Sequence, residues 1–428
     1  MSAIVRELTS TFEALRVRNF RLFLGAQAVS VTGTWMQSIA QMWLVLHLTG
    51  SGLALGITAA LQFLPMLLFG TYGGLIADRI DKRRLLMLTQ SLAGVTALML
   101  AGLTLSGLVQ LWMVYVLAFT LGMVNVFDNP ARQSFVTEMV GRELVTNAVG
   151  LNSAVFTGAR VIGPAIAGIL ITVVGTGYCF LYNGLSYFPV VGALVLMKAT
   201  ELNRAAPMPK AKGQIREGMR YAWNRAELRF PLLLMLVIGL LAFNFSVLLP
   251  LMARFVFGAG AGTFGLLMSF MGIGAFIGAL FSAHRKLPTH RLLAFSGALL
   301  GVFLIGAALA PNLWLELAVL IPMGGAMTTF QATANSLLQL NSEARFRGRV
   351  MALYVIVFIG STPIGGPIVG WIAQQYGARA GLALGGVAAL VASIVVLWFQ
   401  RRLGVGLGTA APRVQLREAG APGGASIG

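Results

Sequence analysis

The sequence has 428 residues, of which 57% are hydrophobic and only 10% are charged, and its net charge is +18. Soluble domains carry about 25% charged residues, so this composition excludes a soluble globular protein. The positive charge does not indicate nucleic-acid binding, because the basic residues lie in short runs between apolar segments, as in membrane proteins. One cysteine, Cys179, and three scattered histidines exclude an internal disulfide and predict no metal site.

Long apolar stretches recur along the chain. Each has about 18 to 27 residues, enough to cross a hydrocarbon core of about 30 Å as an α-helix. The predicted spans lie near Phe20–Leu48, Leu53–Ala77, Leu85–Ser106, Val109–Phe127, Ala148–Val174, Tyr178–Met197, Pro231–Phe255, Ala261–Ala283, Leu292–Ala310, Leu313–Leu338, Ala352–Tyr376 and Gly381–Phe399. The sequence therefore predicts an all-α integral membrane protein with twelve transmembrane helices.

The distribution of charge predicts the orientation. If the N-terminus is cytoplasmic, all of the 31 Lys and Arg residues except Arg160, Arg254 and Arg379 fall in cytoplasmic segments. An even number of spans then places both termini inside a multi-pass protein of the cell (inner) membrane. The expected division is a cytoplasmic N-terminal segment, a six-helix bundle, a cytoplasmic linker with an amphipathic helix, a second six-helix bundle and a disordered cytoplasmic tail, over residues 1–19, 20–197, 198–229, 230–402 and 403–428.

The two halves of the chain resemble each other. Gly163-Pro164 in the fifth predicted span has a counterpart in Gly366-Pro367 in the eleventh, 203 residues later. Parallel repeats of six helices are a transporter architecture, so the repeat predicts two pseudo-symmetric six-helix bundles. We expect the Gly-Pro pairs to make their helices flexible where they pack closely. The alternative is a kinked helix with a structural role alone.

The loop after the second span carries the most specific motif. It begins with Gly74, continues with Asp78-Arg79 and ends in a basic run that includes Lys82 and Arg83. This order resembles motif A of the major facilitator superfamily, with Asp81 where the motif usually has Gly. Three further stretches look like the enterobactin-exporter-like branch of that superfamily, namely Asn129–Gln133, Ala159–Pro164 and Arg347–Met351.

The resemblance implies the major facilitator fold and transport by alternating access. The branch contains siderophore exporters and multidrug effluxers thought to be proton-driven. It therefore implies a secondary active exporter of a drug, siderophore or related metabolite, powered by the proton gradient as an antiporter and using no cofactor. The expected partners are the small-molecule substrate and membrane lipid, with no nucleic acid, and the protein is expected to be a monomer.

A gate is expected at the cytoplasmic end. The eleventh span begins there, and the positive end of its helix dipole would stabilise a carboxylate such as Asp78 by roughly 0.3–1 kcal/mol. In related transporters the motif-A arginine pairs with an acid at the end of the fourth helix, which implies that Arg79 pairs with Asp128. The expected gating residues are Gly74, Asp78, Arg79, Lys82, Arg83 and Asp128. Alternatively, these charges set only the topology.

A polar stripe on the first span predicts a substrate cavity. Its residues are spaced by three and four, so they share one helical face, which must point inward in lipid. The expected cavity residues are Gln27, Ser30, Thr34, Gln37 and Gln41, with Asn152 and Arg160 from the fifth span. Arg160 would be the central charge near the membrane midplane. The alternatives are interhelical hydrogen bonds for the stripe and backbone contacts that lock helix packing for Arg160.

Two acids are candidates for proton coupling. Asp128 and Glu316 lie at or inside the ends of predicted spans, where ionisable groups are functional candidates. No Gly-Lys pair of a P-loop and no Gly-x-Ser-x-Gly or His-Glu-x-x-His motif is present, so no enzyme is predicted. An importer or facilitator remains an alternative within the same class. A membrane enzyme or lipid scramblase, and a receptor or scaffold, are alternatives from other classes.

Overall fold

The computed structural model describes residues 12–203, 214–284 and 288–403. These residues form helices and connecting turns, with no strand among them. The elements, in chain order, are η1 (Glu13–Arg16), α2 (Arg18–Thr49), α3 (Gly52–Arg79), α4 (Lys82–Leu105), α5 (Leu111–Val174), α6 (Thr176–Leu196), η2 (Ala199–Glu201), α7 (Gln214–Trp223), α8 (Ala226–Leu241), α9 (Phe245–Leu251), η3 (Met252–Val256), α10 (Ala261–His284), α11 (His290–Leu309), α12 (Leu313–Leu340), α13 (Ala344–Gly360), α14 (Thr362–Tyr376) and α15 (Ala378–Leu403).

Many of these helices are long and apolar enough to cross a membrane. Ten such stretches occur in the described residues, one of them the 64-residue helix α5. The helix α2, predicted as the first span, is not among the ten, because its glutamines and hydroxyl residues lower its hydropathy. The prediction of an all-α, multi-pass membrane protein is confirmed.

The prediction of a loop between the fourth and fifth spans, Val109–Phe127 and Ala148–Val174, is wrong. The segment that contains Asn129–Gln133 is helical, and α5 departs from helical geometry only at Gly141, whose φ of 74° is open to glycine. Long-range packing explains this continuity. The ring of Phe135 is fully buried and meets the ring of Phe23 edge-on, with centroids 6.0 Å apart. A polar-looking segment is therefore held as a packed helix.

Two predicted spans are interrupted. The seventh is divided into α8, α9 and the π-helical turn η3. The eleventh is divided at Ser361 into α13 and α14. The stretch Arg347–Met351, predicted to precede that span, lies inside α13 because the helix begins at Ala344.

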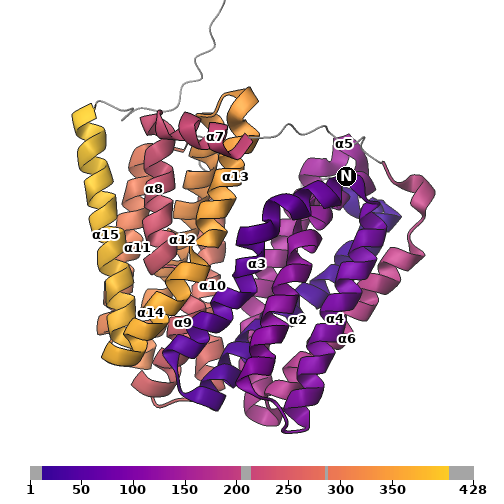
Figure 1. The fold of residues 1–428 in the computed structure, drawn as a ribbon, viewed down its shortest axis with the longest axis horizontal. Coiled ribbons are helices and arrows are strands. Elements are labelled where there is room, and N and C mark those ends of the chain that lie inside the picture. The colour runs from indigo at the N-terminus through magenta and orange to yellow at the C-terminus, as the bar shows by residue number, and fades with distance from the viewer. Residues whose placement is uncertain (1–11, 204–213, 285–287, 404–428) are drawn as a thin grey trace, which may run out of the picture.

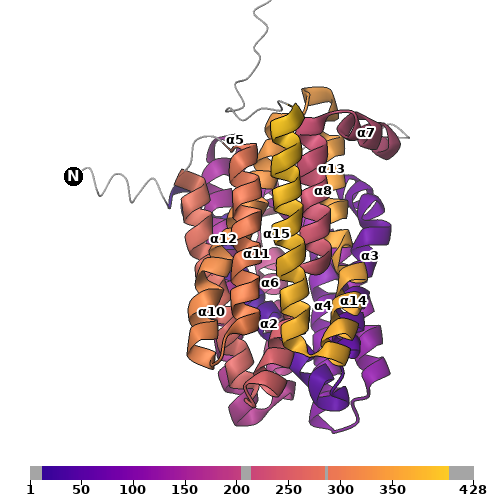
Figure 2. The ribbon, with the colours of Figure 1, turned by 90° about the vertical axis from the view of Figure 1, so that its left-hand side faces the viewer.

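The helices form two groups that lie side by side (Figure 1). The first group is α2–α6 and the second is α8–α15, and most packing is within each group. Two pairs join the groups extensively, α3 with α14 and α5 with α10. We refer to the end of the molecule where α7 lies as the α7 end and to the end where α2 turns into α3 at Gly50 as the opposite end. Seen from the side, α11 and α15 lie on the outer face of the second group (Figure 2).

The helix α7 is attached to the second group. Its Glu217 carboxylate lies 2.6 Å from Arg349 and 3.7 Å from Arg345, both on α13. The rings of Tyr221 and Phe346 stack with centroids 4.1 Å apart. Ion pairs between exposed side chains contribute little alone, but the stacked rings add buried apolar area, so α7 and the start of α13 form one unit.

Candidate transport pathway

Close backbone contacts join the two groups at the opposite end. A Cβ atom added at Gly56 of α3 would lie 2.3 Å from the carbonyl oxygen of Gly366 on α14, and one at Gly370 would lie 2.3 Å from the oxygen of Gly52. Between α5 and α10, a Cβ at Gly265 would lie 2.5 Å from the oxygen of Pro164. Only glycine allows this approach, as in other small-residue helix contacts. We call these two lines of contact the glycine seams.

Of the predicted helix-flexing residues, Pro164, Gly366 and Pro367 belong to these seams, whereas Gly163 packs on α2 within the first group. A Cβ at Gly163 would lie 2.6 Å from Trp35 Cβ, and Gly366 and Pro367 face Gly56. The backbone of α14 is helical through its Gly-Pro pair, and the non-helical residue of α5 is Gly141 rather than Gly163. The structure therefore gives these pairs a packing role.

Side-chain hydrogen bonds reinforce the closure. Ser51 Oγ donates to Gln374 Oε1 over 2.6 Å, and Leu53 N donates to the same oxygen over 3.2 Å. Arg254 Nη1 donates to the carbonyl oxygen of Leu46, 2.8 Å away at the end of α2. A fourth bond, from Ser269 Oγ to Val161 O, lies nearer the middle of the helices. In the described part of the chain these four are the hydrogen bonds between the groups, and none lies toward the α7 end.

Several apolar side chains of α3 and α5 toward the α7 end are not covered by the other group. Leu68 and Tyr72 of α3 are 53% and 65% exposed, and Val149 of α5 is 47% exposed. These residues belong to the helices that form the seams but lie beyond the glycine contacts, although Leu67 of α3 still meets Gly360 of α13. The close backbone contacts are therefore at the opposite end, and the helices of the two groups diverge toward the α7 end (Figure 1).

Arg160 lies where α5 leaves its seam. Its own carbonyl oxygen is 3.1 Å from the Cβ position of Gly272 on α10, and its guanidinium carbon is 5.8 Å from the ring centroid of Trp35. The side chain is half-buried, and no acid among the described residues pairs with it. Asn152, two helical turns earlier on α5, has a buried Oδ1 without a partner. The structure thus leaves two polar groups of α5 unsatisfied near the parting of the groups.

The polar side chains along one face of α2 divide into those with a hydrogen-bond partner on α6 and those without a side-chain partner. Asn183 Nδ2 donates to Gln37 Oε1 over 2.7 Å, and Thr34 Oγ1 lies 3.4 Å from Tyr187 Oη, so both face α6 within the first group. For these two residues the contacts match the alternative of interhelical hydrogen bonds rather than a cavity lining. Gln27 Oε1 and Gln41 Nε2 are buried without a partner, and Ser30 is buried.

The motif-A bases fasten the first group together. Lys82 Nζ and Glu138 Oε1 are 2.6 Å apart, and both side chains are nearly buried. Arg83 donates to the carbonyl oxygens of Leu194 and Val195 at the end of α6, over 2.6 and 2.9 Å. A cation at this position complements the negative end of the helix dipole. These bases therefore join α4 to α5 and α6.

Asp81, where the motif usually has Gly, is the N-cap of α4. Its Oδ1 accepts a hydrogen bond from Arg84 N over 3.1 Å, a contact that stabilises a helix start by about 1 kcal/mol. Arg79 is exposed at the end of α3, and Gly74 has open space around its Cβ position. The side chain of Asp78 lies outside the described residues.

Asp128 and Glu316 differ in their partners. Asp128 Oδ1 accepts hydrogen bonds from Thr89 Oγ1 at 2.8 Å and Gln90 Nε2 at 2.7 Å, and its Oδ2 lies 3.4 Å from Arg132. Its described contacts are thus within the first group. Glu316 is fully buried in the first turn of α12, and neither of its carboxylate oxygens has a hydrogen-bond partner.

Some residues that join the two groups carry no signal that the predictions above used. Gln374 and Arg254 carry the polar contacts of the closed end, and the charge pattern distinguishes Arg254 only as an exception to the positive-inside rule. Gly52-x-x-x-Gly56 and Gly366-x-x-x-Gly370 are small-xxx-small patterns, a signal that could have located the seam. No group of three or more metal-binding side chains occurs in the described residues.

Long apolar helices in two groups that meet along close seams are an arrangement found in membrane transporters. The family model described as transmembrane secretion effector matches residues 9–408. The chain belongs to this family of the major facilitator superfamily, as the motif indicated. The prediction of an efflux-type superfamily member is therefore confirmed.

Two relatives with known names are similar to this chain over most of its length. The staphyloferrin A transporter of Staphylococcus aureus (strain NCTC 8325 / PS 47) is 25% identical over 394 residues, 90% of this chain and 96% of the relative. The multidrug efflux pump Tap of Mycolicibacterium fortuitum is 26% identical over 395 residues, 89% and 95% of the two chains.

Two solved structures share the fold. The nucleoside transporter NupG has a TM-score of 0.69 at 12% identity, covering 89% of this chain and 98% of that chain. A bacterial homologue of the human lysosomal transporter Spinster, in an inward-facing and unoccupied conformation, has a TM-score of 0.66 at 14% identity, covering 90% and 95%. At these identities the likeness concerns the fold alone.

Proposed function

We propose that this protein exports a drug, siderophore or related metabolite by alternating access, driven by proton antiport. The observation that carries the proposal is the pair of glycine seams, which close one end of the molecule while the polar face of α5 lies where the groups part. The names of the relatives, a staphyloferrin A transporter and a multidrug efflux pump, support export. Import is not favoured by these relatives.

The proposal includes twelve spans in two six-helix bundles. The first bundle counts α5 as two spans that meet near Gly141, together with α2, α3, α4 and α6. The second counts α8, α9 and η3 as one interrupted span and α13 with α14 as another. The protein would act as a monomer without a cofactor.

The orientation follows from charge. The α7 end carries the basic residues of motif A and α7, so the positive-inside rule places this end in the cytoplasm. Reporters fused after Lys198 and after Arg402 should be active only when the reporter works inside the cell. If a reporter that works only outside the cell gave a signal at either position, the proposed orientation would be wrong.

Arg160 is the proposed recognition residue for anionic or electron-rich cargo. An Arg at the bilayer centre costs at least about 2.5 kcal/mol on insertion scales, so it is retained where it serves a function or has a partner. Trp35 provides one contact to its guanidinium group, which has five N–H donors and forms no ion pair among the described residues. An acidic or catechol-like molecule would supply acceptors for these donors.

Uptake by everted membrane vesicles tests both the function and this residue. Vesicles with the wild-type chain should accumulate 2,3-dihydroxybenzoate and ethidium when a proton gradient is imposed. Arg160→Gln should reduce accumulation of the acidic catechol about tenfold, the effect of about 1.4 kcal/mol, while ethidium changes less than about twofold. Arg142→Gln, a change of an exposed arginine on the same helix, is the matched control.

The outcomes separate the two claims. If the wild-type vesicles accumulated both compounds equally with and without the proton gradient, proton-driven export would be overturned. Equal loss of both compounds in Arg160→Gln, with a clear drop in thermal stability, would make Arg160 a packing residue and leave export intact.

A further inference from the structure

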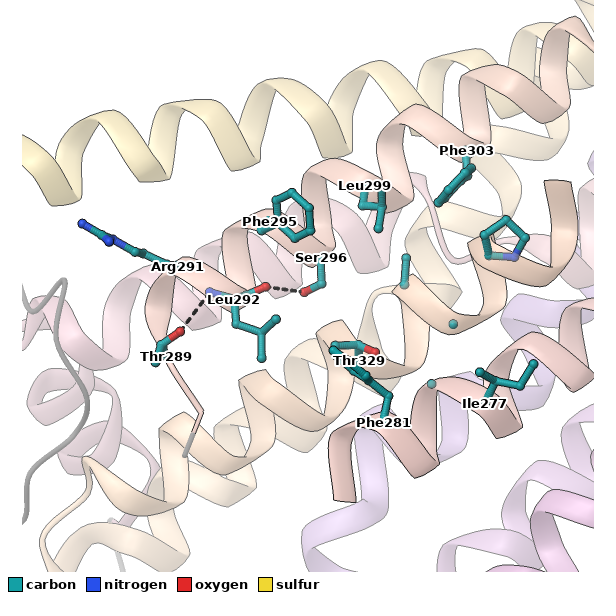
Figure 3. A pocket seen from close by; sticks show the side chains of 14 residues that line it. Ile277, Phe281, Thr289, Arg291, Leu292, Phe295, Ser296, Leu299, Phe303 and Thr329 are labelled. Atoms are coloured by element: carbon teal, nitrogen blue, oxygen red, sulfur yellow. Dashed lines mark hydrogen bonds between the residues drawn. The ribbon is translucent and has the colours of Figure 1, made fainter. Parts of the chain in front are cut away.

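A groove of about 620 Å³ runs along the outer face of the second group, between α10, α11 and α12. Its walls are α10 and α11, which each pack on α12 but hardly touch each other. The floor is α12, where the lining residues Gly325, Ala326 and Thr329 have small side chains that make the groove deeper. Thr329 is labelled in Figure 3. The helix α11 has no extensive contact with the first group, so the groove is separate from the proposed transport pathway.

The lining is apolar and open to the side of the molecule. Phe295 of α11 and Phe281 and Ile277 of α10 are 63%, 47% and 53% exposed at its walls (Figure 3). Along α11 the lining extends from Thr289 to Phe303, which is about 21 Å at 1.5 Å per residue. Half of a hydrocarbon core is about 15 Å thick, so the groove is long enough for a lipid acyl chain to lie along it.

A positive charge stands at one end of the groove. Arg291 lines the groove at its α7 end, is exposed, and extends outward from the first turn of α11 (Figure 3). No acid among the described residues pairs with it. A cation so near a helix N-terminus opposes the helix dipole, so Arg291 does not serve to stabilise α11. Its charge is available to an external anion at the membrane surface.

We infer that this groove binds an anionic phospholipid of the surrounding membrane. One acyl chain lies between Phe295 and Phe281 over the small residues of α12, and the phosphate headgroup is held by Arg291. The combination of an apolar channel with a cation at headgroup level matches the charge and length of such a lipid. A zwitterionic lipid could fill the channel but would gain less from the unpaired arginine.

Native mass spectrometry of the purified full-length protein tests this site. The probes are dioleoyl phosphatidylglycerol, dioleoyl phosphatidylcholine, oleate and glycerol 3-phosphate. We expect tighter binding of phosphatidylglycerol than of phosphatidylcholine, and loss of this preference by about fivefold in Arg291→Gln, the effect of one basic residue near an anionic surface. Arg84→Gln, an exposed arginine at the start of α4 at the same end, should leave it unchanged.

A second variant tests the channel itself. Leu299→Trp adds a bulky ring to the groove wall on α11 and should weaken both phospholipids alike without changing the thermal stability of the lipid-free protein. Equal binding of the two phospholipids to the wild type, or equal effects of Arg84→Gln and Arg291→Gln, would overturn the inference. Binding of oleate as tight as that of phosphatidylglycerol, unaffected by Arg291→Gln, would assign the groove to acyl chains alone and also contradict it.

Discussion

Gly56→Val is expected to abolish transport while the chain remains folded. The added side chain would begin 2.3 Å from the carbonyl oxygen and 2.6 Å from the carbonyl carbon of Gly366, so α3 and α14 must separate. Such overpacking costs about 1–3 kcal/mol, and it is felt only when the opposite end is closed. A difference of this size between two conformations changes their ratio by about 5- to 150-fold.

The shift can be measured as two distances between spin labels. A pair at Leu108 and Asn312 reports on the opposite end and should move apart in Gly56→Val, while a pair at Glu143 and Leu340 should approach at the α7 end. Gly102→Val is the matched control, because Gly102 is also inside a helix but has no atom within 4 Å of its Cβ position.

Unchanged distances together with normal transport would show that the seam is not a moving contact. If valine prevents insertion, Gly56→Ala provides the smaller step, since its single methyl group meets the same backbone atoms.

Glu316→Gln is expected to remove proton-driven accumulation while downhill movement of substrate persists. Glu316 is fully buried in the first turn of α12 without a hydrogen-bond partner for either oxygen. A buried ion without a partner costs several kcal/mol, so we propose that Glu316 takes up a proton while the opposite end is open, still carries it in this conformation, and loses it toward the α7 end before cargo is exported. Glutamine has nearly the same shape but cannot release a proton.

The charged groups near Glu316 are few. Arg379 of α15 is within electrostatic range, and its guanidinium group donates a 2.7 Å hydrogen bond to Ala310 O. Opening of this end would expose the carboxylate to water, from which it would take up its proton. Asp128, the other candidate for coupling, already has Arg132 and two hydrogen bonds, so we expect Asp128→Asn to affect the packing of the first group more than the coupling.

The measurement compares substrate accumulation in vesicles with and without an imposed proton gradient. Glu316→Gln should reduce the gradient-driven part to the level found with a protonophore, and Glu316→Asp should retain some of it. Glu143→Gln, which changes an exposed acid, is the control. Full accumulation by Glu316→Gln would exclude this residue as the proton carrier.

The positions of most helices could be predicted because hydrophobic length determines them. The stretch Tyr178–Met197 was predicted where α6 occupies Thr176–Leu196, and Leu292–Ala310 where α11 occupies His290–Leu309. The segment around Pro130 could not be predicted, because its polar composition is typical of a loop. Contacts distant in sequence, such as Lys82 with Glu138, hold it in a helix.

The residues of the candidate site could also be predicted only in part, because their partners are distant in the sequence. Sequence spacing predicted that the α2 stripe shares one face, but not whether that face meets α6 or the partner group, and Gln37 is bonded to Asn183 of α6. Arg160 was located near the middle of a span from its position in the sequence, and the structure places it at the end of a seam. The bonds of Gln374 depend on two helices more than 300 residues apart in the chain meeting at one end, which no local pattern contains.

Because α7 is attached to α13, the chain between residues 203 and 214 connects the first group to the second with a fixed number of residues. Asn203 is bonded to the first group, since its N–H donates to Glu138 O over 2.8 Å, and Gln214 begins the helix that is fixed to the second. Eleven residue steps separate these two anchors, and a chain of that length spans at most about 36–40 Å. While both anchors hold, the widest separation of the halves at this end is limited by the length of the connecting chain, whatever cargo enters.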